Sequence, residues 1–146
     1  MNKIKIIISK YYHTTTGQMV RFGLVGVINT ILDIGIYYNL TRQTEFFRGH
    51  ILSAKILSFL VASGFSFLVN RWWTFDRRDK IKYLEIFKFY STVGAGVFIN
   101  VGVLYILSVR FHIFDLIAVL MSTILTFLWG FTFSKRWVFK SQDYLN

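Results

Sequence analysis

Four strongly polar side chains interrupt the apolar stretches of this chain and are its first candidates for chemistry. Asp33 and Lys55 carry charges, and Asn29 and Asn100 carry amides. A charge at the centre of a membrane-spanning helix costs about 2.5–3.5 kcal/mol on insertion scales, so such residues are rare without a role. An acid and a base in an apolar setting suit two tasks: an ion pair that neutralises both charges, or recognition of a ligand with an anionic group.

The expected depths of Asp33 and Lys55 bring the two charges within reach of each other. Asp33 follows Arg21 by twelve positions, which is roughly 18 Å along a helix and just past the middle of a bilayer entered from the side of Arg21. Lys55 lies roughly 7 Å inside the far end of the next apolar stretch. We therefore predict that the two residues are coupled, as a structural pair or as part of a binding site, unless Lys55 extends outward to the membrane surface.

Other kinds of chemistry lack the residues that they need. The chain has no cysteine, which excludes thiolate metal sites and disulfides. His13, His50 and His112 lie far apart and outside the apolar stretches, without the spacing of metal ligands. The sequence has no nucleophile–base signature and no phosphate-binding glycine loop. We therefore expect a protein that is not an enzyme and that holds neither a metal nor another cofactor.

The composition is typical of a membrane protein. Hydrophobic residues make up 54% of the chain and charged residues 16%, whereas charged residues make up roughly 25% of a soluble domain. The net charge of +10 would suggest a nucleic-acid partner for a soluble protein. Beside membrane spans, however, basic residues set the orientation and contact anionic headgroups. We therefore expect membrane lipids, and no nucleic acid, as partners.

Four apolar stretches are long enough to cross the hydrocarbon core as helices. They are Phe22–Leu40, Ile51–Val69, Phe89–Val109 and Ile113–Phe133. The connections inside the first and the second pair are short, so each pair is expected to form an antiparallel hairpin. The longer polar link Arg71–Lys88 joins the two hairpins. The predicted fold is an all-α membrane protein, with four transmembrane helices in a single domain over residues 1–146.

Lysine and arginine are distributed unequally between the two expected sides of the membrane. Thirteen lie near the N-terminus, in the central link or in the C-terminal tail, whereas Arg42, Arg48 and Arg110 lie in the other connections. Because basic residues in short loops stay in the cytoplasm, both termini are predicted to be cytoplasmic. The predicted location is the cytoplasmic membrane, crossed several times. Residues 1–10 are expected to form a short basic segment at its surface.

The second hairpin repeats the first. Residues 21–40 return 67 positions later, and residues 54–75 return 64 positions later. Repeat 1 covers about residues 20–75 and repeat 2 about residues 87–140. Since both repeats enter the membrane from the same side, they are expected to be parallel copies, related by an axis along the membrane normal.

The charges inside the spans are not repeated. Asn100 stands where Asp33 stands in the first repeat, and Val119 stands where Lys55 stands. A purely architectural ion pair could have been kept in both copies. The asymmetry favours one site for a single anionic ligand group.

Several motifs resemble those of the GtrA-like membrane proteins. The first hairpin carries Phe22-Gly23-Leu24-Val25-Gly26-Val27-Ile28-Asn29-Thr30 with Asp33, then Ala54-Lys55, then Asn70-Arg71-Trp72-Trp73-Thr74-Phe75. The second hairpin ends on a similar motif, Lys135-Arg136-Trp137-Val138-Phe139, but Ser134 and Lys135 replace the Asn-Arg pair. The resemblance covers about residues 20–140.

The resemblance implies a role in the synthesis of cell-surface polysaccharide or in glycosylation. GtrA-like proteins are thought to translocate a polyprenyl-phosphate-linked sugar from the cytoplasmic to the outer leaflet. Some look like accessory subunits that recruit a membrane glycosyltransferase, so a scaffold without transport is the alternative. A small cation or drug antiporter is a third possibility, which the basic interfaces and Lys55 disfavour. The implied partners are the lipid-linked sugar and a glycosyltransferase, and homo-oligomerisation stays open.

The translocase hypothesis assigns a role to each polar residue. Arg71 and Lys135, joined by Arg21 and Lys88, would attract the phosphate at the cytoplasmic interface. The other candidates would line the route of the polar headgroup. These are Asn29, Asp33, Lys55 and Asn100.

Overall fold

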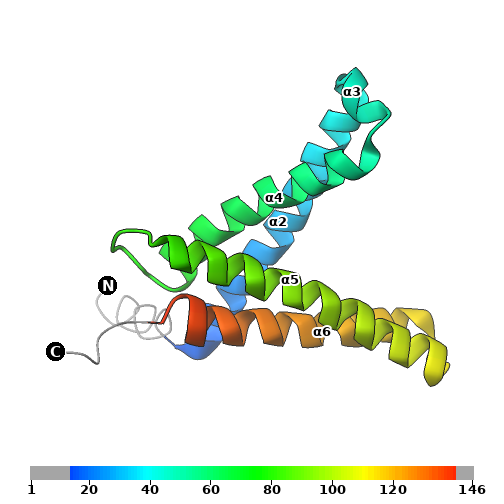
Figure 1. The fold of residues 1–146 in the computed structure, drawn as a ribbon. Helices are drawn as coiled ribbons and strands as arrows, with labels where there is room; N and C mark the ends of the chain where they lie inside the picture. Colours follow the sequence, from blue (N-terminus) through cyan, green and yellow to red (C-terminus); the bar gives the residue numbers. More distant parts are fainter. Residues whose placement is uncertain (1–13, 141–146) are drawn as a thin grey trace, which may run out of the picture. The chain divides into compact units, whose positions relative to one another are not determined.

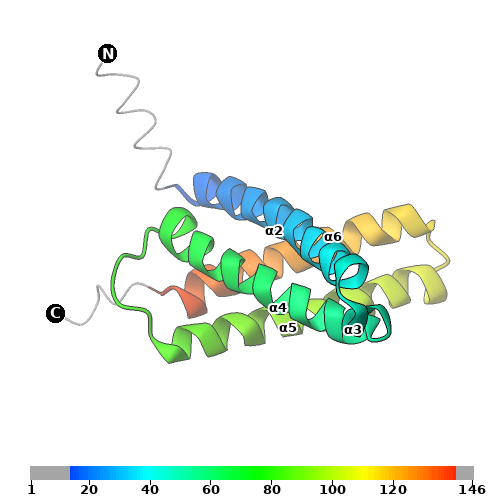
Figure 2. The same cartoon turned by 90° about the horizontal axis from the view of Figure 1, so that it is seen from above.

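The computed structural model describes residues 14–140, and all the regular structure in this range is helical. The chain divides into two compact units, Met1–Arg78 and Asp79–Asn146. Each unit contains two long helices that pack side by side (Figures 1 and 2). The basic segment predicted over residues 1–10 lies outside the described residues.

Unit 1 is built from α2 (Thr15–Gln43) and α4 (Ile51–Val69), joined by the short α3 (Glu45–Arg48). Thr14 begins α2, because its hydroxyl accepts a hydrogen bond of 3.1 Å from the free N–H of Gly17. The contact between α2 and α4 buries small side chains, among them Ala54 and Ala62. Small residues let two helix backbones approach closely where the hydrophobic effect does not drive association.

Unit 2 is built from α5 (Tyr83–Tyr105) and α6 (Asp115–Phe133). A π-helical turn, η2 (Ile106–Arg110), extends α5. The connection to α6 then turns at His112, whose φ of 51° lies in the left-handed region that His adopts more readily than bulky apolar residues do. Ala118 and Ser122 on α6 are buried in the contact with α5.

Within residues 14–140, four helices are long and apolar enough to cross a membrane, as the apolar stretches predict. They run over Thr15–Gln43, Ile51–Thr74, Tyr83–Arg110 and Leu116–Val138. Each extends beyond the predicted span at one end or both, because backbone hydrogen bonding continues past the apolar residues into the polar flanks. The orientation of the termini, the single domain and the parallel arrangement of the two repeats stay predictions.

The same local features recur at equivalent positions of the two units. A π-helical turn ends each unit's second long helix: η1 (Asn70–Thr74) follows α4, and η3 (Ser134–Val138) follows α6. Each turn is closed by a backbone hydrogen bond, of 2.9 Å in unit 1 and 2.8 Å in unit 2. The phenylalanine after each turn packs against an equivalent ring on the first helix, with ring centroids 6.2 Å apart in both units.

Candidate intramembrane polar site

The structure brings Asp33 and Lys55 into direct contact inside unit 1. Asp33 extends from α2 toward α4, where the Lys55 Nζ forms a salt bridge with its Oδ2. The Ser58 hydroxyl, one turn further along α4, donates a hydrogen bond of 2.6 Å to the other carboxylate oxygen. Both oxygens of Asp33 therefore have a donor, as a carboxylate in an apolar environment requires.

The two charged partners differ in their exposure. The Asp33 side chain is 15% exposed, whereas that of Lys55 is 51% exposed. Ser58 is fully buried, and its Oγ also lies 3.0 Å from the Lys55 carbonyl oxygen. The carboxylate is therefore held between the helices, while the ammonium lies at the surface of the helix pair.

Asn29 is not part of this hydrogen-bonded group. It lies one turn before Asp33 on α2, and its Oδ1 is buried without a hydrogen-bond partner in the described structure. A buried amide oxygen without a donor costs about 1–3 kcal/mol. The structure therefore places Asn29 beside the charged pair but does not link it to the pair.

In unit 2, the position of the ion pair holds a neutral cluster. Asn100 on α5 donates through Nδ2 to Thr126 Oγ1 at 3.2 Å and approaches Ser122 Oγ at 3.4 Å, both on α6. The Ser122 hydroxyl donates to the Val119 carbonyl at 2.9 Å, which matches the contact between Ser58 and the Lys55 carbonyl in unit 1. The serine framework is thus common to both units, and the charges are specific to unit 1.

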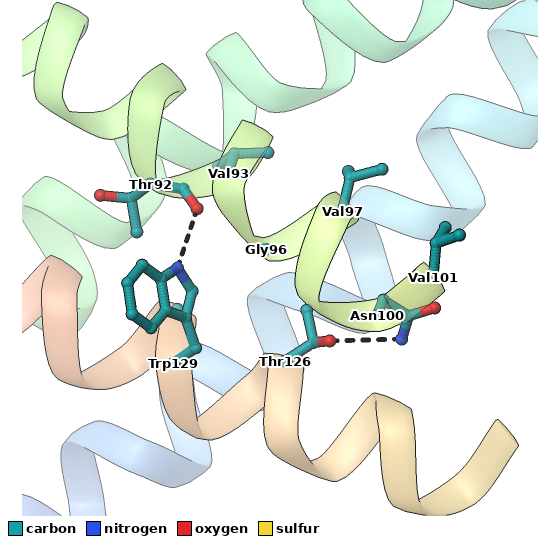
Figure 3. A pocket seen from close by; sticks show the side chains of 9 residues that line it. Thr92, Val93, Gly96, Val97, Asn100, Val101, Thr126 and Trp129 are labelled. Carbon is teal, nitrogen blue, oxygen red and sulfur yellow. Dashed lines mark hydrogen bonds between the residues drawn. The ribbon is translucent and has the colours of Figure 1, made fainter. Parts of the chain in front are cut away.

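A pocket of about 300 Å³ lies beside this neutral cluster, between α5 and α6 (Figure 3). Trp129 forms part of its wall, and the indole Nε1 donates to the Thr92 carbonyl at 3.1 Å. The lining residues are mainly apolar, and they include the Asn100 amide. The full lining is Thr92, Val93, Gly96, Val97, Asn100, Val101, Thr126, Trp129 and Gly130.

Arg71 is fully buried at the end of unit 1. Its Nη1 donates to the Arg77 carbonyl at 3.0 Å. The neighbouring Asn70 and Thr74 are buried as well, and the Thr74 hydroxyl donates to Asn70 Oδ1 at 2.9 Å. Arg21 Nη2 donates to the Thr74 carbonyl at 3.2 Å. These side chains therefore secure the end of α4, and the phosphate-binding role of Arg71 stays a prediction.

Lys135 has a different environment from its counterpart Arg71. It is half-buried, and its Nζ lies 5.8 Å from the centroid of the Phe131 ring. Lys88 Nζ lies 5.6 Å from the centroid of the Trp137 ring. Such contacts between a cation and an aromatic face contribute about 0.5–1 kcal/mol at exposed sites.

The role of Trp129 was not predicted from the sequence. The other tryptophans lie at the ends of the spans, whereas Trp129 lies inside the fourth predicted span. A large aromatic residue with a polar N–H, placed among small residues, is the signal that could have pointed to this pocket. Within residues 14–140, no group of three His, Asp or Glu side chains could hold a metal ion.

A family model described as "GtrA/DPMS, transmembrane domain" matches residues 21–139 of the chain. The match runs from Arg21 in unit 1 to Phe139 in unit 2, so it includes both the ion pair and the neutral cluster. No curated protein and no solved structure matches the chain. The match confirms the resemblance that the sequence motifs indicate.

Proposed function

The chain belongs to the GtrA/DPMS transmembrane-domain family, and we propose that it translocates a polyprenyl-phosphate-linked sugar across the cytoplasmic membrane. The family suggests the handling of lipid-linked sugars. Movement of the sugar across the membrane is our more specific proposal. The product would serve the synthesis of cell-surface polysaccharide or glycosylation. Both termini are proposed to be cytoplasmic, and a membrane glycosyltransferase is the proposed partner on the sugar's route.

The observation that carries this proposal is the ion pair between Asp33 and Lys55. Lys55 is half-exposed, so its ammonium can turn toward a lipid phosphate at the surface of the helix pair. Asp33 would still accept the hydrogen bond from Ser58 when Lys55 turns away. This second donor lowers the cost of releasing the lysine, because the carboxylate does not lose every partner at once.

Transport also suits the asymmetry between the two units. A phosphate needs one cation, and the second unit offers an amide and hydroxyls at the equivalent position of the repeat. A lipid-linked sugar has one anionic group and a neutral, hydroxylated sugar, whereas its polyprenyl chain can stay in the bilayer. No bond is made or broken in such movement, so the proposal needs no catalytic residue.

The experiment that tests the proposal uses the purified chain in liposomes without other proteins. A labelled polyprenyl-phosphate hexose is placed in one leaflet, and its arrival in the other leaflet is followed over time. Transport above that of protein-free liposomes supports the proposal. No transport, in protein that is inserted and folded, contradicts it.

A scaffold that recruits a glycosyltransferase is the second candidate function. It is favoured by the burial of Arg71, because the guanidinium expected to load the phosphate instead donates to a backbone carbonyl. A scaffold would bind its enzyme through apolar helix faces, so it would co-purify with the enzyme and show no transport alone. The ion pair counts against a cation antiporter, because Lys55 already neutralises Asp33.

A further inference from the structure

Two glycines at the pocket between α5 and α6 break the internal repeat. Gly96 stands where Asn29 stands in the first repeat, and Gly130 stands where Ser66 stands. Both glycines line the pocket. Unit 2 thus lacks two polar side chains at the positions where unit 1 has them, and the pocket lies at those positions.

The pocket has a polar group that hydrocarbon cannot satisfy. The Asn100 Nδ2 is bonded to Thr126, and the amide oxygen is directed away from Thr126 (Figure 3). This orientation of the amide fits its neighbour, because the Thr126 hydroxyl donates to the Ser122 carbonyl at 2.8 Å and therefore accepts from Asn100. In the bilayer interior a free amide oxygen is costly, and a ligand hydroxyl is one donor that satisfies it.

The remaining lining selects the kind of ligand. No ionisable side chain lines the pocket, so it does not suit a phosphate. Its volume of about 300 Å³ is at the lower end of the range for small-molecule sites, roughly 300–1,000 Å³. Valine side chains and the Trp129 indole provide apolar surface next to the amide and the Thr126 hydroxyl. A sugar ring presents the same combination, with apolar C–H faces and hydroxyl edges.

We infer that this pocket, formed by Gly96, Asn100, Thr126 and Trp129, binds the sugar ring of the lipid-linked substrate. The inference rests on the proposed function and concerns the sugar end of the substrate headgroup. The free end of the Asn100 amide in unit 2 forms a hydrogen bond with a sugar hydroxyl, and the Trp129 ring lies against the sugar.

The test is equilibrium binding to the full chain in lipid nanodiscs, with a polyprenyl-phosphate hexose and with the same polyprenyl phosphate without sugar as probes. Val97→Phe places a ring in the pocket. Val119→Phe is the matched control, since Val97 is 48% exposed and Val119 46% exposed but Val119 does not line the pocket. We expect Val97→Phe to weaken binding of the hexose lipid roughly tenfold, about 1.4 kcal/mol, and to leave binding of the sugar-free lipid and both affinities of the control unchanged.

A second measurement reads the pocket directly. In a variant with Trp72, Trp73 and Trp137 replaced by Phe, the fluorescence comes from Trp129. Binding of the hexose lipid should change the emission of Trp129, and binding of the sugar-free lipid should not. Equal responses to both lipids, or equal weakening of both by Val97→Phe, would mean that the pocket holds the lipid part and would overturn the inference. Both experiments measure binding and not transport. Failure of the translocase proposal would therefore appear separately, in the liposome assay.

Discussion

At the residue scale, the charged pair inside unit 1 is the feature that most needs a functional explanation. The salt bridge and the Ser58 hydrogen bond satisfy Asp33. At the equivalent position of unit 2, the neutral Asn100 bonds across its own helix pair without any charge. A neutral solution is therefore compatible with this helix pairing. Keeping two charges in the membrane is costly, and under the proposed function a ligand that needs the ammonium of Lys55 would account for that cost.

The coupling of the pair is testable by a double-mutant cycle. Asp33→Asn and Lys55→Met should each destabilise the protein by about 1–3 kcal/mol, less than for a fully buried pair because Lys55 is half-exposed. The double variant should recover at least about 1 kcal/mol of the summed loss. The measurement is unfolding by denaturant in detergent micelles. Strictly additive losses would show that the two charges act independently.

At the scale of elements, the π-helical turn after α4 shows what a sequence motif does in the fold. Asn70 donates to Ser66 Oγ at 3.1 Å and accepts from the Thr74 hydroxyl, so both ends of its amide are used. Arg71 bonds the Arg77 carbonyl beyond the turn. Through Arg71, the motif therefore bonds the end of α4 to the link that follows it, at Arg77. After η1, Asp76 takes a φ of 49°, which Asp tolerates better than most residues.

This arrangement predicts unequal effects of equivalent substitutions in the two units. Arg71→Gln removes a buried hydrogen-bonded guanidinium and should destabilise the protein by about 1–3 kcal/mol. Lys135→Gln is the matched control, because Lys135 is half-buried and should cost less than about 1 kcal/mol. Thermal unfolding of the two purified variants compares them. If Arg71→Gln left stability unchanged and abolished transport, Arg71 would be a ligand residue after all.

Helices and their pairing were largely predictable from the sequence, whereas their ends and the pocket were not. The apolar stretches predicted the four spans, and the depths of Asp33 and Lys55 predicted their contact. The burial of Arg71 was not predictable, because charge patterns report distance from the membrane but not packing. The pocket depends on the position of the Trp129 ring between two helices, which helical periodicity does not determine.

At the scale of the whole molecule, the distribution of basic residues predicts how the chain lies in the membrane. Reporter fusions at Asn146 and within the connection of residues 41–50 should report opposite sides, with Asn146 in the cytoplasm. A fusion in the link of residues 76–82 is the internal control and should agree with Asn146. Reporters at Asn146 and in residues 41–50 on the same side would contradict the model of four spans.

The central claim is that this chain moves a lipid-linked sugar by means of Lys55. The most direct measurement is leaflet-resolved transport of a polyprenyl-phosphate hexose in liposomes that contain only the purified protein. The wild type should transport, and Lys55→Arg should retain part of the rate because it keeps the charge. The double variant Lys55→Met/Asp33→Asn should lose transport, although it leaves no buried charge without a partner. Transport by the double variant at the wild-type rate would contradict the claim, and so would a folded, inserted wild type that does not transport.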